Sequence, residues 1–374
     1  VKIALRLGID EEDIHRAEFL VRQHLVMGQM SQRRDLDDLE MIANFATLCG
    51  DEENLRELYL LTFCDLSSVA PDNLTTWKET LLRELYQRTL TVLRRGGDLL
   101  GAERAEIAQR RQERAARLLA DDRGGAFIPP AVLFQGFPDR YFVDNSAARV
   151  AGHMRLLAQR RKSGAASTIE VSHQKRVEVS ELVLAAIDQP GLLAEVAGVL
   201  HANKINIVDA AIYSRVSTPD QPGEALDIFR VRDSYGRLVT DEARWNKIGA
   251  DLEAVISGKV KVESLVAARP RGDSITMWKV PEVPTEIKID NDGSRAFTIV
   301  EVITGDYPGI LYEIARTMFA HGLDIHRSKI ATEANRVVDT FYVRGRKSGE
   351  KLTDATAISA LRDALRESLP TTTK

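Results

Sequence analysis

The sequence predicts an α+β protein of several domains, in which an all-α N-terminal region precedes two copies of a βαββαβ module. Three observations lead to this prediction. Apolar residues recur three and four positions apart through residues 1 to 122, which is helical spacing. Beyond residue 179, short apolar runs bounded by turn residues replace that spacing, as is typical of strands. Finally, a motif of this second region occurs again 118 residues farther along the chain.

The composition excludes several functional classes. A chain of 374 residues with 44% hydrophobic content can bury more than one core. Its 51 basic and 55 acidic residues nearly balance, which gives no reason to expect nucleic acid or an anionic membrane as partner. Cys49 and Cys64 occur without a CxxC motif and fit reduced core thiols of a cytoplasmic protein. No apolar stretch has the length of a membrane span or of a signal peptide. The start at Val1, inside an amphipathic pattern, suggests a fragment of a longer protein.

The end of the helical region and the segment that follows it have simple interpretations. Arg and Glu alternate at helical spacing from Glu103 to Leu119, which favours a solvated, salt-bridged face over a nucleic-acid patch. Prolines and paired glycines then predict irregular structure over 121–150, followed by a short helix over 147–160 and a linker near 162–164.

The repeat defines the two modules. The motif DQPGLLAEVA at 188–197 recurs as DYPGILYEIA at 306–315, and the register holds as far as Ile212 and Ile330. The spacing predicts second helices over 245–256 and 355–369. A strand over 260–266 completes the first copy. The last strand of the second copy is short, is missing, or is replaced by 285–289 from the connection between the copies.

Each copy turns from its first strand into its first helix through an Asp-x-Pro-Gly corner. Asp188 and Asp306 are placed to cap free backbone amides, and the proline that follows fits a first helical turn. Gly191 and Gly309 allow the backbone to come close to a ligand or to another strand. Free N–H groups and the helix dipole form a seat for a carboxylate, such as that of an amino acid. A capped helix with nothing bound is the alternative, and the duplication of the corner favours a ligand.

The start of the second strand of each copy completes the candidate site. Asn206 and Asp324 occupy equivalent positions there. Their side chains have two candidate roles, contact with the polar groups of a ligand and formation of a turn. The predicted amino-acid site therefore comprises Asp188, Gly191, Leu192, Asn206, Asp306, Gly309, Ile310 and Asp324.

The tandem modules resemble ACT domains, which bind amino acids at interfaces between copies, over residues 179–267 and 295–370. The helical half resembles part of the HD domain of the bifunctional uridylyltransferases and uridylyl-removing enzymes of the nitrogen-regulatory protein PII. The segments 24–27, 32–36, 61–65 and 77–82 carry this resemblance, and 137–142 and 283–291 resemble the connecting segments of the same family. The domain boundaries that follow are a partial HD-type helical domain at 1–122, a connecting segment at 123–178, ACT domains at 179–267 and 295–374, and an inter-ACT connection at 268–294.

The resemblance implies an enzyme that attaches UMP to PII and removes it, with glutamine sensed by the ACT pair. Attachment needs a nucleotidyltransferase domain, for which this chain has no room, so that activity is expected to be absent here. Removal would use a divalent metal, Mg or Mn, and His24 and Asp65 match metal-binding positions. The adjacent His-Asp pair of HD domains would lie upstream. A packed or surface role for His24, and an ion pair of Asp65 with Arg33 or Arg34, remain alternatives.

Two other functions compete with this interpretation. One is a non-catalytic amino-acid-binding regulator whose helical half is a scaffold. The other is part of a guanosine tetraphosphate hydrolase, which also combines HD and ACT domains. The second is disfavoured because no synthetase-like segment follows the helices and because two ACT copies are present.

Overall fold

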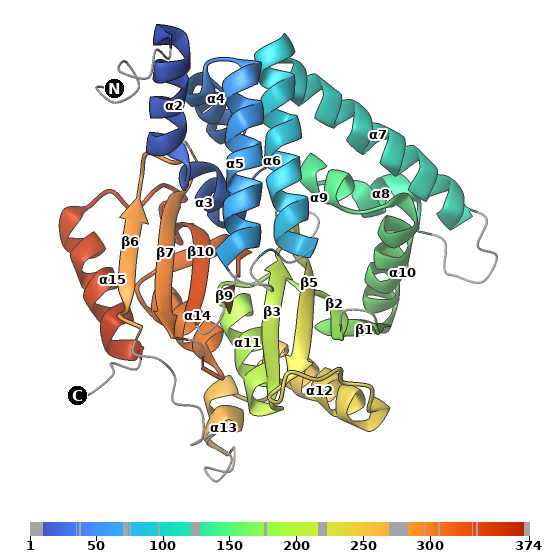
Figure 1. Ribbon diagram of the computed structural model, residues 1–374. Helices are drawn as coiled ribbons and strands as arrows, with labels where there is room; N and C mark the ends of the chain where they lie inside the picture. The colour runs from blue at the N-terminus through green and yellow to red at the C-terminus, as the bar shows by residue number, and fades with distance from the viewer. Residues whose placement is uncertain are drawn as a thin grey trace. The chain divides into compact units, whose positions relative to one another are not determined.

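The protein, a computed structural model of residues 1–374, comprises two compact units, Val1–Ala105 and Glu106–Lys374 (Figure 1). The structure describes residues 10–34, 36, 39–69, 74, 76–95, 98–120, 128–175, 178–215, 223–268, 283–294, 296–305, 307–330, 332–333 and 336–369.

The first unit is helical, as its apolar spacing predicts. Its described helices are α2 (Glu11–Gln23), α3 (Val26–Arg33), α4 (Leu39–Cys49), α5 (Glu52–Val69), α6 (Thr76–Arg95) and the start of α7 (Asp98–Ala120). Helices α3, α4 and α5 all contact α6. Their apolar faces share one core, whose fully buried members include Met27, Ile42, Phe45, Leu55, Leu58, Leu82 and Leu85. Cys49 is a buried member of this core, as predicted. The prediction that Cys64 is a core thiol is wrong, because this residue is exposed on α5.

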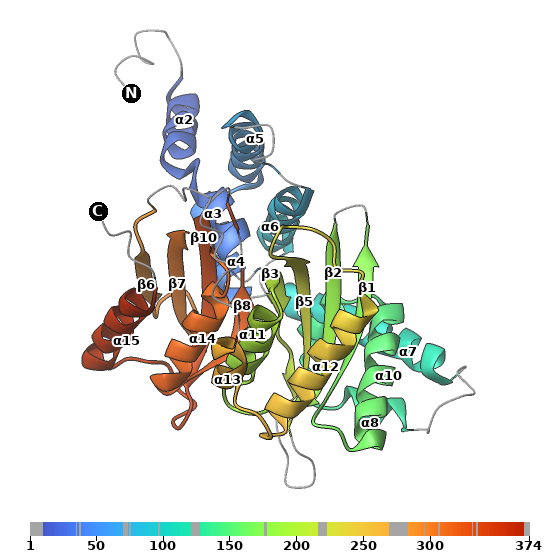
Figure 2. The same ribbon diagram turned by 90° about the horizontal axis from the view of Figure 1, so that it is seen from below.

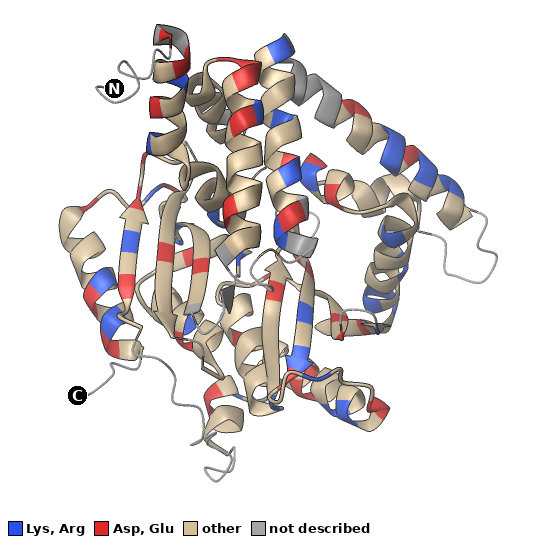
Figure 3. Ribbon diagram, viewed as in Figure 1, with Lys and Arg blue, Asp and Glu red and all other residues tan. Residues whose placement is uncertain are grey.

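Three helices of the second unit occupy part of the stretch that was predicted to be irregular. They are α8 (Pro130–Phe134), α9 (Asp139–Asp144) and α10 (Ala147–Ser163), the last of which confirms the predicted helix over 147–160. The Ser146 hydroxyl caps α10 by accepting the N–H of Arg149 at 3.4 Å, and Gly164 ends the helix at a φ of 68°. On α7, the ion pair of Arg110 with Glu106 confirms the salt-bridged face. Figure 3 shows acidic and basic positions interspersed along this helix.

The first module is an antiparallel sheet with the strand order β1-β2-β5-β3. Its strands are β1 (Ser167–Gln174), β2 (Val179–Ile187), β3 (Ile205–Ala211), β5 (Glu224–Asp233) and the short β4 (Ser214–Arg215), which pairs with β5. Its helices are α11 (Leu192–Ala202), α12 (Glu242–Ile256) and α13 (Val262–Ala267). Both faces of β2 are covered, because Leu182 and Leu184 belong to the core with α11 and α12 while Val183 and Ala185 belong to the core with α8, α9 and α10.

The second module repeats this sheet with the strand order β6-β7-β10-β8. Its strands are β6 (Glu286–Asp290), β7 (Thr298–Gly305), β8 (Leu323–Lys329), β10 (Arg336–Gly345) and the short β9 (Thr332–Glu333), and its helices are α14 (Ile310–Ala320) and α15 (Ala355–Ser368). The predicted second helices are therefore present in both copies as α12 and α15. The predicted α+β class is confirmed.

The fourth strand of each sheet comes from the residues before the copy. In the second copy, β6 supplies it, which confirms the alternative that placed 285–289 there. In the first copy, the prediction of a strand over 260–266 is wrong, because these residues form α13 and β1 pairs with β2 instead. The reason is the spacing of Val262, Leu265 and Val266, which places all three on one helical face packed against the core. Strand β1 thus lies in the segment predicted to be a connection, and the domain boundaries themselves remain predictions.

The two modules lie side by side, with α11 against α14 and β3 beside β8 (Figures 1 and 2). Gly198 of α11 makes the close approach possible. A Cβ atom at this position would lie 2.4 Å from Cγ2 of Val262 and 2.9 Å from the ring of Tyr312 in α14. Such distances are too short for a side chain, so the helices can pack this closely only around a glycine.

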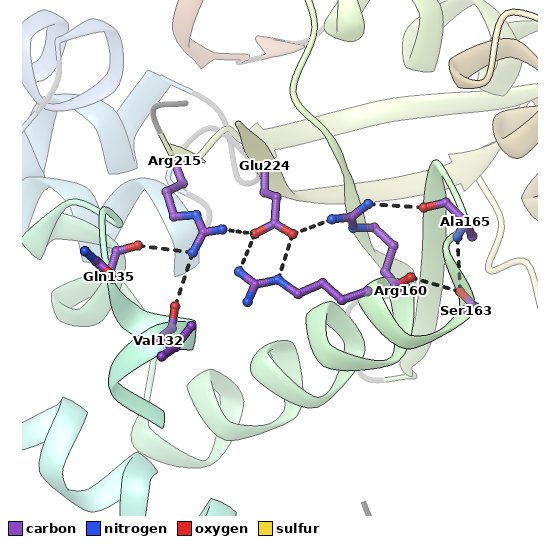
Figure 4. A network of polar contacts seen from close by, with 8 residues as sticks. Val132, Gln135, Arg160, Ser163, Ala165, Arg215 and Glu224 are labelled. Carbon is purple, nitrogen blue, oxygen red and sulfur yellow. Dashed lines mark hydrogen bonds and ion pairs between the residues drawn. The ribbon is translucent and has the colours of Figure 1, made fainter. Parts of the chain in front are cut away.

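A buried ion cluster joins α8 and α10 to the first sheet (Figure 4). Glu224, at the start of β5, is 2% exposed and accepts hydrogen bonds from Arg160, Arg161 and Arg215. The Arg161 contacts measure 2.9 and 2.7 Å. Burial raises the pKa of Glu224, but hydrogen bonds from Arg161 and Arg160 outweigh it, so the net pKa lies below its usual range. Arg215 also donates to two backbone carbonyl oxygens, that of Val132 in α8 at 3.2 Å and that of Gln135 in the turn after it at 3.4 Å.

Replacing Gly198 by Ala is expected to lower the free energy of unfolding by about 1–3 kcal/mol, because the added methyl group collides with Val262 and Tyr312. Gly152→Ala is the matched control, since Gly152 also lies inside a helix but no atom lies within 4 Å of the point that its Cβ would occupy. That control should raise stability by up to about 1 kcal/mol. Urea denaturation followed by circular dichroism measures both. Equal effects of the two substitutions would contradict the packing argument.

Replacing Glu224 by Gln is expected to lower the free energy of unfolding by about 3–5 kcal/mol, because three guanidinium groups then share a site without a counter-charge. Glu106→Gln removes the exposed ion pair with Arg110 and should change stability by less than about 1 kcal/mol. Both are measured by urea denaturation. A loss for Glu224→Gln as small as that of the control would show that the cluster does not stabilise the fold.

Candidate functional site

Each Asp-x-Pro-Gly corner ends in a glycine with a left-handed backbone. Gly191 and Gly309 are the N-cap residues of α11 and α14, with φ values of 87° and 92°, and no side chain caps either helix. A Cβ atom on Gly191 would lie 3.0 Å from the ring of Phe319, and one on Gly309 would lie 2.6 Å from the ring of His201. Each corner therefore faces the end of the first helix of the other copy, as expected for a pseudo-twofold arrangement.

The prediction that Asp188 caps the helix is wrong. Because Gly191 is the N-cap, Asp188 stands three residues too early, and its carboxylate instead forms a hydrogen bond with Ser214 of β4. Burial and the nearby Asp324 raise the pKa of Asp188, while the bond with Ser214 opposes that rise. Asp306, its counterpart in the second copy, lies outside the described residues. The first amide of each helix donates within the corner, from Leu192 to the carbonyl oxygen of Gln189 at 3.1 Å and from Ile310 to that of Tyr307 at 3.3 Å. Among the described residues, no side chain caps the amides that follow.

The corner of the first copy and the start of β8 enclose a cavity of about 280 Å³, named cavity one. It brings together four residues of the predicted site, namely Asp188, Gly191, Leu192 and Asp324. The first three come from one copy and the last from the other. The sequence alone placed Asp324 in its own copy, so this partnership is a finding of the structure.

The corner of the second copy and the start of β3 enclose a related cavity of about 210 Å³, named cavity two. Asn206, Gly309 and Ile310 of the predicted site line it. Tyr307 and Tyr312 also contribute to its wall. All seven described residues of the predicted amino-acid site therefore line one of two cavities at the interface between the copies.

Cavity one contains a buried acid that the sequence analysis missed. Asp227 of β5 is 1% exposed, and its Oδ1 accepts the backbone N–H of Tyr213 at 3.2 Å. Burial, together with the charge of Asp188, raises the pKa of Asp227 to about 8. An acidic residue inside an apolar strand run, repeated as Asp339 in the second copy, was the signal that could have identified it.

A short segment connects cavity one to the helices on the other face of the sheet. Ile212 and Ser214 line the cavity, while the residues that alternate with them point to α8, α9 and α10. Tyr213 donates from its hydroxyl to the Asp144 carboxylate at 2.9 Å, and Arg215 joins the Glu224 cluster. A shift of this segment in response to a ligand would therefore move contacts on both faces.

The candidate metal residues lie in the first unit. His24 follows α2 and donates from Nδ1 to the carbonyl oxygen of Val21 at 2.8 Å, while Asp65 lies on α5. The hydroxyl of Thr62, one turn before Asp65, is 3.5 Å from the carbonyl oxygen of His24. Within the described residues, no three His, Cys, Asp or Glu side chains form a group that fits a metal ion. Two side chains do not make a catalytic metal site, so the pair remains a prediction.

The fold and the cavities define the class of protein. Two modules with the same sheet order pack side by side, and a ligand-sized cavity lies at each strand-to-helix corner between them. A family model described as an ACR9-like, ACT-like domain matches residues 286–374, which is the second module starting at β6. The chain is thus a tandem ACT-type protein with a helical N-terminal unit.

Over its whole length, the chain is homologous to the C-terminal part of bifunctional uridylyltransferase/uridylyl-removing enzymes. The enzyme of Rhodospirillum rubrum is 31% identical over 382 residues, which cover 100% of this chain and 38% of that enzyme. Those of Rhodopseudomonas palustris and Azospirillum brasilense are also 31% identical, over 97% and 98% of this chain and 38% of their own length. The resemblance predicted from the sequence is confirmed, and the chain spans less than half the length of these relatives.

Among the described helices, none combines the length and the apolar character that a membrane span requires.

The raised pKa of Asp227 predicts a specific dependence of stability on pH. The folded chain keeps a proton that the unfolded chain releases above its ordinary pKa of 3.8, so this group lowers stability as the pH rises from 3.8 towards 8. Asp227→Asn removes the titration and keeps an acceptor for Tyr213. The variant should lose less stability than the wild type between pH 5 and about 8, measured by urea denaturation at each pH. Parallel profiles for the two proteins would contradict a buried, protonated Asp227.

Proposed function

We propose that this chain is the regulatory C-terminal portion of an enzyme that uridylylates and deuridylylates the PII protein, and that its paired ACT modules sense glutamine. The observation that carries the proposal is the pair of interface cavities at the two Asp-x-Pro-Gly corners, in a chain homologous throughout to such enzymes. Glutamine in the cavities would favour removal of UMP from PII over its attachment. A cytoplasmic location follows from this role.

The cavities suit a free amino acid. Their volumes of about 280 and 210 Å³ lie just below the ~300 Å³ at which sites for drug-sized molecules begin. Among the described residues, no side chain caps α11 or α14, so the helix dipoles and the first-turn N–H groups that follow Leu192 and Ile310 are available to a carboxylate. The carboxyl groups in cavity one offer acceptors for an ammonium group.

The segment from Ile212 to Arg215 supports a regulatory role for cavity one. A ligand held against Ile212 and Ser214 biases the position of β4, and Arg215 transmits that bias to α8 and α10 through Glu224. Such coupling requires that the ligand bind one arrangement of the segment more tightly than the other. Only this difference in binding free energy can shift the contacts with α8 and α10.

The metal-dependent step belongs to the complete enzyme. A divalent ion, Mg or Mn, would activate water for attack on the phosphodiester of uridylylated PII, and His24 and Asp65 would contribute two of its ligands. The described residues do not complete that set, so they do not form a catalytic centre by themselves. A non-catalytic regulator with a helical scaffold fits less well, because the homology to the enzymes extends through the helical unit.

Calorimetry of the chain with glutamine, glutamate and other amino acids tests the sensor. We expect glutamine to bind, and Gly191→Ala to weaken binding by about tenfold or more, because its Cβ forces a left-handed residue against Phe319. Gly258→Ala is the control. Gly258 has a φ of 74°, but no atom lies within 4 Å of the position of its Cβ, so the variant shares the backbone strain without altering a cavity. If none of these amino acids binds the wild-type chain, the sensor proposal is wrong.

A further inference from the structure

The two cavities differ in charge at equivalent positions, and the difference assigns them different roles. We propose that cavity one is the site that holds an α-amino acid by its ammonium group, that Asp324 selects for this charge, and that cavity two lacks the selectivity. The inference rests on the proposed function, because it assumes an amino-acid ligand. It goes beyond that function by naming the cavity and the residue that recognise the ligand.

Cavity one gathers acidic groups from both copies without a matching cation. Asp188 and Asp227 come from the first copy and Asp324 from the second, and the described lining of the cavity contains no Lys or Arg. The only basic side chain in that lining is His326, whose Nε2 lies 3.7 Å from Oδ2 of Asp324. With no Lys or Arg in this lining to oppose it, the carboxylate of Asp324 favours a cationic group over a neutral or anionic one, and the carboxyl oxygens of Asp188 and Asp227 offer further polar contacts.

The three acids of cavity one differ in burial and in pKa. Among the described residues, the only hydrogen bond to the Asp227 carboxyl comes from the N–H of Tyr213, although Asp227 is fully buried. A polar group of the ligand could therefore pair with the other carboxyl oxygen, to which no described residue forms a hydrogen bond. Burial and neighbouring acids raise the pKa values of Asp227 and Asp188, so these two groups resist ionisation. Asp324, with 43% of its side chain exposed, is the acid that an entering ligand reaches first.

Cavity two lacks this arrangement. Asn206 occupies the position of Asp324, so a neutral amide replaces the carboxylate. The acid in its described lining, Asp233, already accepts the N–H of Arg237 at 2.8 Å and its guanidinium at 3.0 Å. Arg232 also lines this cavity. The described wall of cavity two therefore has its negative charge compensated, and a ligand ammonium gains little there.

The start of α11, which also lines cavity one, provides a place for the carboxylate of an amino acid. Gly191 begins α11 without a side-chain cap, and the positive end of the helix dipole favours a carboxylate there. The ligand would thus lie between the helix start of one copy and Asp324 of the other. An α-amino acid carries both charges on one carbon, whereas its deaminated analogue retains only the group that the helix start recognises.

Calorimetry of the full chain with L-glutamine tests the assignment through two variants that each remove one carboxylate. Asp324→Asn should weaken binding by about tenfold to a hundredfold, the range for loss of a charge-assisted contact. Asp363→Asn, at a side chain of α15 that is 62% exposed and lines neither cavity, should leave the affinity for glutamine within about twofold. Both substitutions preserve side-chain size, and circular dichroism with thermal unfolding checks that each variant is folded. Asp324→Glu, which restores the charge, should recover part of the affinity.

The deaminated analogue of glutamine, glutaramic acid, separates ammonium recognition from a structural role of Asp324. It should bind the wild-type chain more weakly than glutamine, and Asp324→Asn should not weaken it further. If Asp324→Asn reduces the affinity for both compounds equally, Asp324 does not contact the ammonium group. An unchanged affinity of Asp324→Asn for glutamine, or an equal loss in Asp363→Asn, overturns the assignment of cavity one. Absence of amino-acid binding to the wild type instead refutes the proposed function, and with it this inference.

Discussion

The close packing of α11 against α14 is the contact on which the candidate site depends. Gly198 permits it, because any side chain there would occupy the space of Val262 and Tyr312. With the helices at this distance, each Asp-x-Pro-Gly corner lies opposite the end of the other copy's first helix, so that Gly191 faces Phe319. Both cavities are lined by residues from the two copies, and a single copy would leave the same corner open to solvent.

The first module is constrained on both faces of its sheet, and this distinguishes it from a free-standing sensor. Its β2 strand contributes to two cores, one with α11 and α12 and one with α8, α9 and α10. The buried Glu224 fixes α10 and β4 to the same sheet, and Ser214, beside Arg215, lines cavity one. A ligand in that cavity therefore acts on a strand that the connecting helices also hold.

The errors of the sequence analysis have specific physical causes. The 260–266 run is as apolar as a strand, but its residues pack on one side of a helix against α11, and burial rather than local pattern decides between these states. Asp188 has the residue type of an N-cap, yet the left-handed Gly191 takes that position. Asp227 was overlooked although the same acid recurs as Asp339, because its raised pKa depends on its burial in the folded sheet and on the nearby Asp188.

The sequence by itself determined the helical first unit, the duplicated module, the two corners and the family to which the chain is related, because each depends on residue type and spacing along the chain. Tertiary structure decided which residues meet. Asp324 lies 136 positions after Asp188, and no local pattern reports that the two belong to one cavity while Asn206 belongs to another. That partition follows from the side-by-side packing of two folded copies, a property of surfaces rather than of sequence spacing.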